Sequence, residues 1–147
     1  MNFPRILKKR KGYIDRIKPF MQKSVVKVLT GQRRVGKSFL LYQLIEEILA
    51  KEPDANIIYV NLEDFTFSSL QTAEDLHSYI ISHSKEKVKN YIFIDEIQDI
   101  PGFEKVIRSL LLNEDNDIYI TGSNAKMLSG ELATYLSGRY IEFKIYK

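Results

Sequence analysis

The stretch Thr30–Phe39 reads TGQRRVGKSF, and the spacing of its residues is the most informative feature of the sequence. Gly31 is followed by four residues and then by Gly36, Lys37 and Ser38, which matches the phosphate-binding pattern G-x-x-x-x-G-K-[ST]. Glycine lets a backbone wrap a phosphate with its N–H groups pointing inward. The residues that we expect to contact a nucleotide are Gly31, Gln32, Arg33, Arg34, Val35, Gly36, Lys37, Ser38 and Phe39.

Two side chains of this loop carry its predicted chemistry. We expect the Lys37 ammonium to reach the outer phosphates and the Ser38 hydroxyl to bind Mg²⁺. Such a loop needs a strand before it and a helix after it. The β-branched run VVKVLT (25–30) predicts the strand, and apolar residues at helical spacing over 39–49 predict the helix.

The rest of the chain alternates between strands and helices. Four short β-rich runs are NIIYVN (56–61), YIFID (91–95), DIYIT (117–121) and YIEFKIY (140–146). Helices are predicted between them over 73–83, 103–113 and 125–137. This alternation predicts an α/β fold, a P-loop NTPase three-layer sandwich with a mostly parallel five-stranded sheet. Polar residues that end three of the strands would then meet at the carboxyl edge of the sheet, where ligands bind.

The pair Asp95-Glu96 ends one of these apolar strands. We expect Asp95 to hold Mg²⁺ through the water shell of the ion and Glu96 to orient or deprotonate an attacking water. Taken alone, such a pair is more often a solvated strand end, but a phosphate loop in the same chain favours the catalytic interpretation.

Composition limits the classes of protein that fit. The 147 residues, of which 44% are hydrophobic, suffice for one domain with a core. The chain has no cysteine, and its two histidines, His77 and His83, point to different faces of one predicted helix, so neither a disulfide nor a zinc site is expected. No apolar run approaches the roughly 18 residues of a membrane span. We therefore expect a cytoplasmic protein without a membrane partner.

Positive charge is concentrated near the N-terminus. Residues 1–38 carry 12 Lys and Arg and one acid, whereas residues 39–147 carry 10 Lys and Arg and 18 acids. We expect residues 1–24 to form a basic arm or helix that packs on an ATPase domain of residues 25–147. Clustered Lys and Arg can bind nucleic acid by neutralising phosphates, and a solvated terminal arm is the alternative.

Three blocks of the sequence resemble a known family. GQRRVGKS (31–38), YIFIDEIQ (91–98) and TGSNAKMLSGELATYLSGRY (121–140) are similar to the AAA-like ATPase domain of widespread bacterial and archaeal two-domain ATPases. The resemblance implies ATP and Mg²⁺ as cofactors, hydrolysis of ATP, and the strand order 5-1-4-3-2. In that family a further C-terminal domain follows, so we expect these residues to be a piece of a longer protein.

The same resemblance assigns two more residues. Asn124, with Ser123 as second choice, would sense the γ-phosphate or the water, and a helix N-cap is the alternative role. Arg139 would touch the γ-phosphate of its own or a neighbouring subunit, which in the second case requires a homo-oligomer. Its alternative is a charge at a helix end. The predicted catalytic residues are thus Glu96, Lys37, Asn124 and Arg139, and the predicted metal ligands are Ser38 and Asp95.

Two activities remain open at this point. Glu96 favours hydrolysis of ATP, and no guanine-reading [NT]-K-x-D pattern is present. The alternative is a conformational switch in which bound ATP holds one state and turnover is low without a partner.

Overall fold

The computed structural model describes residues 11–32, 36–123, 132, 134 and 136–146. Five parallel strands form one sheet in the order β2-β3-β4-β1-β5. The strands are β1 (Val26–Thr30), β2 (Asn56–Asn61), β3 (Asn90–Asp95), β4 (Asn116–Gly122) and β5 (Tyr140–Lys144). This is the predicted order read from the other edge, so the predicted sheet is confirmed.

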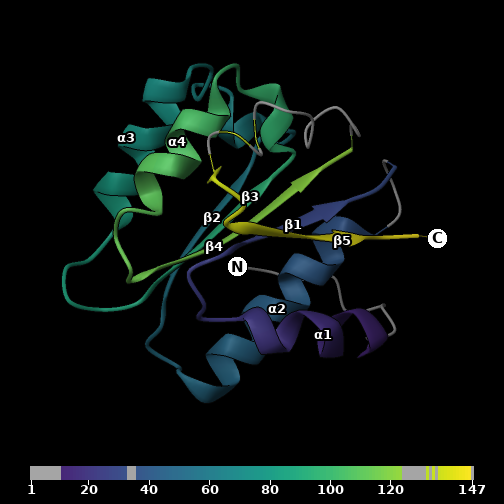
Figure 1. The fold of residues 1–147 in the computed structure, drawn as a ribbon. Coiled ribbons are helices and arrows are strands. Elements are labelled where there is room, and N and C mark those ends of the chain that lie inside the picture. Colours follow the sequence, from purple (N-terminus) through teal and green to yellow (C-terminus); the bar gives the residue numbers. More distant parts are fainter. Residues whose placement is uncertain (1–10, 33–35, 124–131, 133, 135, 147) are drawn as a thin grey trace.

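Helices cover both faces of the sheet (Figure 1). The helices are α1 (Lys11–Ile17), α2 (Lys37–Lys51), α3 (Ala73–His83) and α4 (Phe103–Leu110), and the short 3-10 helices are η1 (Lys18–Phe20), η2 (Phe65–Phe67) and η3 (Ile97–Asp99). Helices α3 and α4 lie on one face, and α1 and α2 lie on the other. The predicted helix over 125–137 falls largely outside the described residues, of which 132, 134 and 136 are helical.

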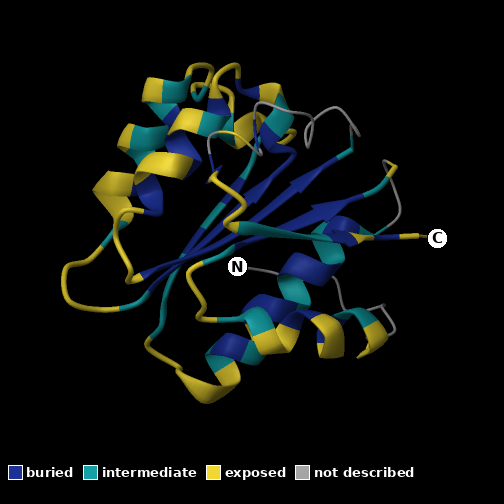
Figure 2. Ribbon diagram, in the orientation of Figure 1, coloured by how far each residue is buried: buried dark blue, intermediate teal, exposed yellow. Residues whose placement is uncertain are grey.

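The strands explain why the core has two halves. Ile92 and Ile94 of β3 pack towards α3 and α4, whereas Tyr91 and Phe93 pack towards α1 and α2. Successive strand residues point to opposite faces, so a strand covered on both sides must be apolar throughout. Figure 2 shows the central strands as a continuous buried layer between partly exposed helices.

Helix α4 is shorter than predicted. It ends at Leu110 instead of Asn113, because the N–H groups of Leu112 and Asn113 donate to the carbonyls three residues back, as in a turn. This turn leads the chain into β4.

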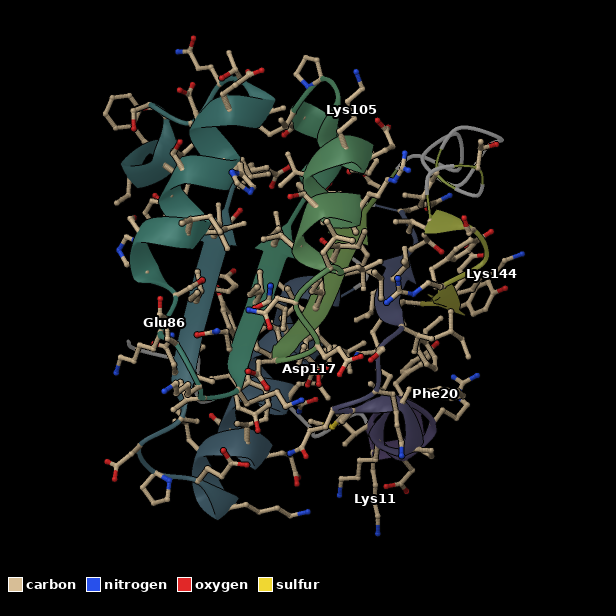
Figure 3. All side chains as sticks on the ribbon, turned by 60° about the vertical axis from the view of Figure 1, so that its left-hand side comes forward. Lys11, Phe20, Glu86, Lys105, Asp117 and Lys144 are labelled. Carbon is tan, nitrogen blue, oxygen red and sulfur yellow. The ribbon has the colours of Figure 1, made fainter. Side chains whose placement is uncertain are left out.

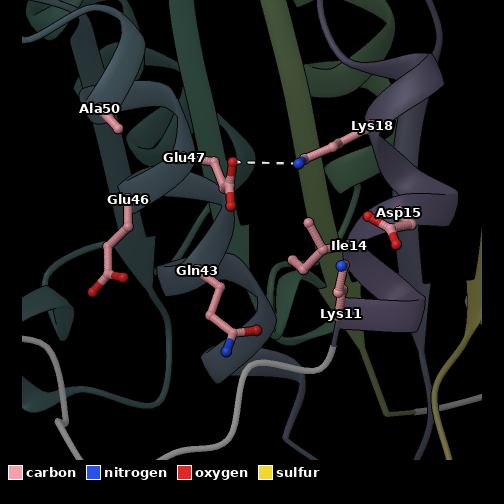
Figure 4. Close-up of a pocket in the computed structure, with 8 residues that line it drawn as sticks. All are labelled: Lys11, Ile14, Asp15, Lys18, Gln43, Glu46, Glu47 and Ala50. Atoms are coloured by element: carbon pink, nitrogen blue, oxygen red, sulfur yellow. Dashed lines mark ion pairs between the residues drawn. The ribbon is translucent and has the colours of Figure 1, made fainter.

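Helix α1 packs on α2 through Ile14 and Ile17, which are buried in the same cluster as the apolar face of α2. Lys18 Nζ lies 3.4 Å from a Glu47 carboxylate oxygen. Beside this ion pair a pocket of about 480 Å³ lies between parts of the two helices, and it is lined by charges of both signs (Figure 4). The basic N-terminal segment thus continues into a helix that rests on α2, while residues 1–10 lie outside the described part of the chain.

A buried ion pair joins β1 to β4, and its carboxylate also binds the segment before β1. Lys27 Nζ lies 2.5 Å from Asp117 Oδ1, and neither side chain is exposed. The Gln22 N–H and the Tyr119 hydroxyl donate to Asp117 Oδ2 at 3.0 and 2.6 Å. Burial lowers the pKa of Lys27, an effect that Asp117 opposes. Figure 3 labels Asp117 at the end of β4 that faces this segment.

Candidate functional site

The carboxyl ends of β3, β4 and β1 lie side by side, because these strands are neighbours in the sheet. Thr30 of β1 pairs with Gly122 of β4, and the Gly31 N–H donates to the Gly122 carbonyl at 3.3 Å. The Thr121 hydroxyl at the end of β4 donates to Asp95 at the end of β3. The sheet therefore gathers the predicted polar strand ends at the edge where the chain enters α2.

The phosphate loop begins at Gly31 and ends in the first turn of α2. Gly36 has a left-handed backbone (φ 89°), which glycine adopts without strain, and its carbonyl accepts the Leu40 N–H to start the helix. Lys37 Nζ donates to the carbonyls of Gly31 and Gln32 at 2.6 and 3.0 Å. Residues 33–35, and with them the predicted contacts of Arg33, Arg34 and Val35, lie outside the described residues.

Asp95 is almost fully buried and accepts three side-chain hydroxyl groups. Ser38 Oγ of the phosphate loop donates to its Oδ2 at 2.5 Å. Thr121 Oγ1 donates to its Oδ1, and the Tyr59 hydroxyl of β2 lies 3.2 Å from Oδ2. The carboxylate is therefore tied to the loop and to both neighbouring strands.

Glu96 follows with a left-handed backbone (φ 60°), a conformation that costs a residue with a side chain about 1 kcal/mol. Its N–H donates to Thr121 Oγ1 at 2.9 Å, which holds this turn. Its Oε2 accepts Gln98 Nε2 at 2.5 Å and Ser123 Oγ at 3.1 Å. Its Oε1 lies 3.6 Å from Lys37 Nζ, and both side chains of that pair are nearly buried.

These contacts form one connected site. Its two carboxylates each meet one residue of the phosphate loop, Asp95 through Ser38 and Glu96 through Lys37. A model of the AAA domain family matches residues 23–147. The chain belongs to the AAA domain family. An AAA domain with this loop has a fold that implies nucleotide binding.

Two curated relatives match this AAA domain. An uncharacterized protein of Haemophilus influenzae is 43% identical over 144 residues, which cover 93% of this chain and 35% of the relative. An uncharacterized protein of Methanocaldococcus jannaschii is 37% identical over 121 residues, which cover 82% of this chain and 26% of the relative. The chain thus spans only about a quarter to a third of the length of these relatives.

Solved structures share the fold of this AAA domain at low sequence identity. The Aeropyrum pernix ORC1 protein in complex with DNA superposes with a TM-score of 0.64 at 15% identity, covering 97% of this chain and 46% of that one. Saccharomyces cerevisiae RIF2 superposes with a TM-score of 0.61 at 13% identity, covering 96% and 57%. These similarities support the fold.

The donor set of this AAA domain fits Mg²⁺ bound together with a nucleotide. Ser38 and Asp95 offer a hydroxyl and a carboxylate oxygen, the hard oxygen ligands that Mg²⁺ prefers. Within the described ranges, no three His, Cys, Asp or Glu side chains gather into a metal cluster. Mg²⁺ bound with a nucleotide usually takes one or two protein ligands and completes its shell with phosphates and water.

Arg139 is a predicted residue that lies away from the site. Phe39 follows Ser38 in the first turn of α2, with its ring packed against Tyr42, and Asn124 is outside the described residues. Arg139 lies at the opposite edge of the sheet, since its carbonyl accepts the N–H of Val26, the first residue of β1. Four strand residues, about 13 Å, separate that level from Thr30. Its guanidinium donates to the Leu111 carbonyl at 3.4 Å, so this position does not support a contact with the phosphate loop of its own chain.

The sequence motifs assign no role to three residues of the site. Thr121 is the last residue of a predicted strand, Gln98 belongs to the block YIFIDEIQ, and Tyr59 belongs to another predicted strand. Gln98 follows Glu96 by two residues, which is a local signal that could have been used. Tyr59 lies 36 residues before Asp95, and only the pairing of β2 with β3 brings them together.

Across the described part of the chain, none of the helices has the length and apolar character to cross a bilayer.

Proposed function

We propose that this AAA domain binds ATP with Mg²⁺ and hydrolyses its γ-phosphate bond. The observation that carries the proposal is that Glu96 Oε1 lies 3.6 Å from Lys37 Nζ, while Asp95 accepts the Ser38 hydroxyl. The Glu96 carboxylate is thus next to the Lys37 ammonium, which would hold the outer phosphates. The Asp95 carboxylate is next to the Ser38 hydroxyl, which would ligate the metal.

Each residue has a distinct task in this proposal. The Lys37 ammonium exchanges the carbonyls of Gly31 and Gln32 for phosphate oxygens, and the first turn of α2 offers its backbone N–H groups to the same anion. Ser38 and Asp95 hold Mg²⁺, which neutralises phosphate charge when bound. Glu96 orients a water and accepts its proton. Asn124 adds a hydrogen bond to the γ-phosphate or the water.

Calorimetric titration with ATP and GTP tests the binding step. Lys37→Ala should severely weaken ATP binding, because the site loses the cation that faces several negative charges. Lys51→Ala, at the exposed end of the same helix, is the matched control and should bind ATP like the wild type. Undiminished affinity in Lys37→Ala would refute the phosphate-loop assignment, and equal affinity for GTP would refute a preference for adenine.

A switch with low intrinsic turnover is the second candidate. The observation that favours it is that Lys37 and Glu96 face each other, while Gln98 and Ser123 hold the second oxygen of Glu96. The Lys37 ammonium must therefore leave Glu96 and its two carbonyl partners before it can bind a phosphate, whereas Gln98 and Ser123 keep Glu96 oriented. Steady-state turnover measured with and without nucleic acid separates the two, since a switch would bind ATP tightly and hydrolyse it only when the partner is present.

A homo-oligomer is part of the proposal through Arg139. Because its guanidinium lies far from the loop of its own chain, we propose that it acts on a neighbouring subunit. Mixing Arg139→Ala with Lys37→Ala protein tests this, since each variant supplies the half-site that the other lacks. A mixture as inactive as its components, under conditions where the wild type is active and oligomeric, would refute a contact between subunits.

Nucleic acid is the proposed macromolecular partner, bound through the basic residues near the N-terminus. The support is the charge asymmetry of the sequence, together with the fold shared with an ORC1 protein that was solved in complex with DNA. Deleting residues 1–11 should weaken DNA or RNA binding and reduce its dependence on salt, with ATP binding unchanged. No binding by the intact chain at low salt would contradict this part of the proposal.

A further inference from the structure

Tyr59 reaches the candidate metal ligand from the strand at the edge of the sheet. It lies in β2 opposite Phe93 of β3, two residues before Asp95, and it packs on the face covered by α2. Its ring lies 5.5 Å from the ring of Tyr42 in α2. This packing aims the Tyr59 hydroxyl along the sheet towards the carboxyl edge, where it meets Asp95 Oδ2 at 3.2 Å.

The direction of this hydrogen bond follows from counting protons. The Tyr59 hydroxyl lies 3.2 Å from Asp95 Oδ2 and 3.3 Å from the Tyr42 hydroxyl, but it carries one proton. An ionised carboxylate can only accept, so the proton of Tyr59 goes to Asp95, and the hydroxyl of Tyr42 is the donor to Tyr59.

The hydrogen bonds to Asp95 fall into two groups. Ser38 comes from the phosphate loop and would itself have to turn a lone pair to the metal. Thr121 and Tyr59 come from the strands on either side of Asp95 and hold different oxygens, Oδ1 and Oδ2. Two donors on opposite oxygens fix the plane of a carboxylate, whereas one donor leaves it free to rotate.

We propose that Tyr59 is a positioning residue for the magnesium of this site: its hydroxyl orients Asp95 Oδ2 for the metal without touching the metal or the nucleotide. The inference rests on the proposed binding of ATP with Mg²⁺. Nothing in the phosphate-loop motif or the acidic strand specifies a tyrosine on the adjacent strand. The proposed role therefore depends on the pairing of β2 with β3 and not on either motif.

The test is a pair of calorimetric titrations with ATP, one in excess Mg²⁺ and one in EDTA. The ratio of the two ATP affinities is the magnesium gain. Tyr59→Phe keeps the ring and its packing on Tyr42 but removes the hydroxyl. We expect it to reduce the magnesium gain by about 10-fold, the lower end of the usual cost of losing the hydrogen bond behind a metal ligand. Affinity in EDTA should stay at the wild-type value, because Tyr59 makes no described contact with the loop.

Two further variants separate this role from a general packing effect. Tyr42→Phe removes a hydroxyl one step further from Asp95 and should leave both affinities close to those of the wild type. Asp95→Asn should abolish most of the gain, and adding Tyr59→Phe to it should have no further effect, because the two residues act through the same oxygen.

The outcomes are distinct. Equal magnesium gains in the wild type and Tyr59→Phe overturn the inference and leave the proposed function intact. An additive loss in the double variant, or a loss that is the same in EDTA, overturns it as well. A wild-type protein that fails to bind ATP with Mg²⁺ overturns the proposed function, and the inference with it.

Discussion

Replacing Gln98 by alanine should slow ATP turnover without changing the affinity for ATP. Gln98 Nε2 donates to Glu96 Oε2 at 2.5 Å, and the same nitrogen lies 3.3 Å from Ser123 Oγ. The amide keeps this arrangement although its own Oε1 is buried with no hydrogen-bond partner among the described residues. A buried acceptor without a partner costs about 1–3 kcal/mol. We infer that the hydrogen bonds of Gln98 Nε2 offset this cost.

The size of the effect follows from the hydrogen bonds to Glu96. A hydrogen bond to a charged group contributes about 1.5–3 kcal/mol, and each 1.36 kcal/mol in the barrier is a factor of about 10 in rate. Ser123 Oγ remains on the same oxygen at 3.1 Å, which favours the lower value. We therefore expect kcat to fall by about 10-fold in Gln98→Ala. The dissociation constant of ATP should not change, because Gln98 makes no described contact with the phosphate loop.

A coupled phosphate-release assay gives kcat, and calorimetry gives the dissociation constant. Asp99→Ala is the matched control, since Asp99 lies in the same 3-10 helix with its side chain exposed. Adding Ser123→Ala should cost more in the Gln98→Ala background than in the wild type, because either donor can hold the oxygen alone. Unchanged kcat in the double variant, or a weaker ATP affinity with unchanged kcat, would refute the assignment of Gln98 as the residue that orients Glu96.

Three further predictions concern catalysis and stability. Glu96→Gln should bind ATP like the wild type but lose turnover, because an amide cannot accept the proton of the water, and wild-type turnover in a phosphate-release assay would contradict the role of Glu96. Asp117→Asn should lower the free energy of unfolding by about 3–5 kcal/mol in urea, because the ammonium of Lys27 stays buried without its charged partner, and a loss below about 1 kcal/mol would contradict this. Hydrogen bonds from the backbone N–H groups of Gln71 and Thr72 lower the pKa of Asp75 from 3.8. The ionised carboxylate then stabilises the fold above that value and ceases to do so as the pH falls through the lowered pKa, so Asp75→Asn should flatten the dependence of the free energy of unfolding on pH in the acidic range.

The sheet and the phosphate loop could be predicted from the sequence because local patterns specify them. The run YIFID (91–95) is apolar on both faces, which only a strand covered on both sides requires, and β3 has these residues buried throughout. The capping box of Thr72 and Asp75 likewise sets the start of α3, whose bounds match the prediction. In each case the signal lies within a few residues of the element that it specifies.

The side chains that orient the acidic pair could not be predicted in the same way. Thr121 lies 26 residues after Asp95, and Tyr59 lies 36 residues before it. Each contact depends on strand order and register, which the sequence leaves implicit. The resemblance favoured Asn124 and Ser123 as sensors. The structure shows that Ser123 contacts Glu96 and that Thr121, at the end of β4, contacts both Asp95 and the Glu96 N–H.

The position of Arg139, in contrast, could have been deduced from the predicted fold. In a parallel sheet, a residue that follows a strand lies at the carboxyl edge, and a residue that precedes a strand lies at the amino edge. Arg139 precedes β5, so it must lie away from the loop that follows β1. For this arginine to serve a neighbour, the amino edge of one subunit has to approach the carboxyl edge of the next. Two different surfaces then meet, and such a head-to-tail contact builds a ring or a filament, not a two-fold dimer. The register of a single edge strand thus restricts the assemblies in which Arg139 could contribute to ATP hydrolysis.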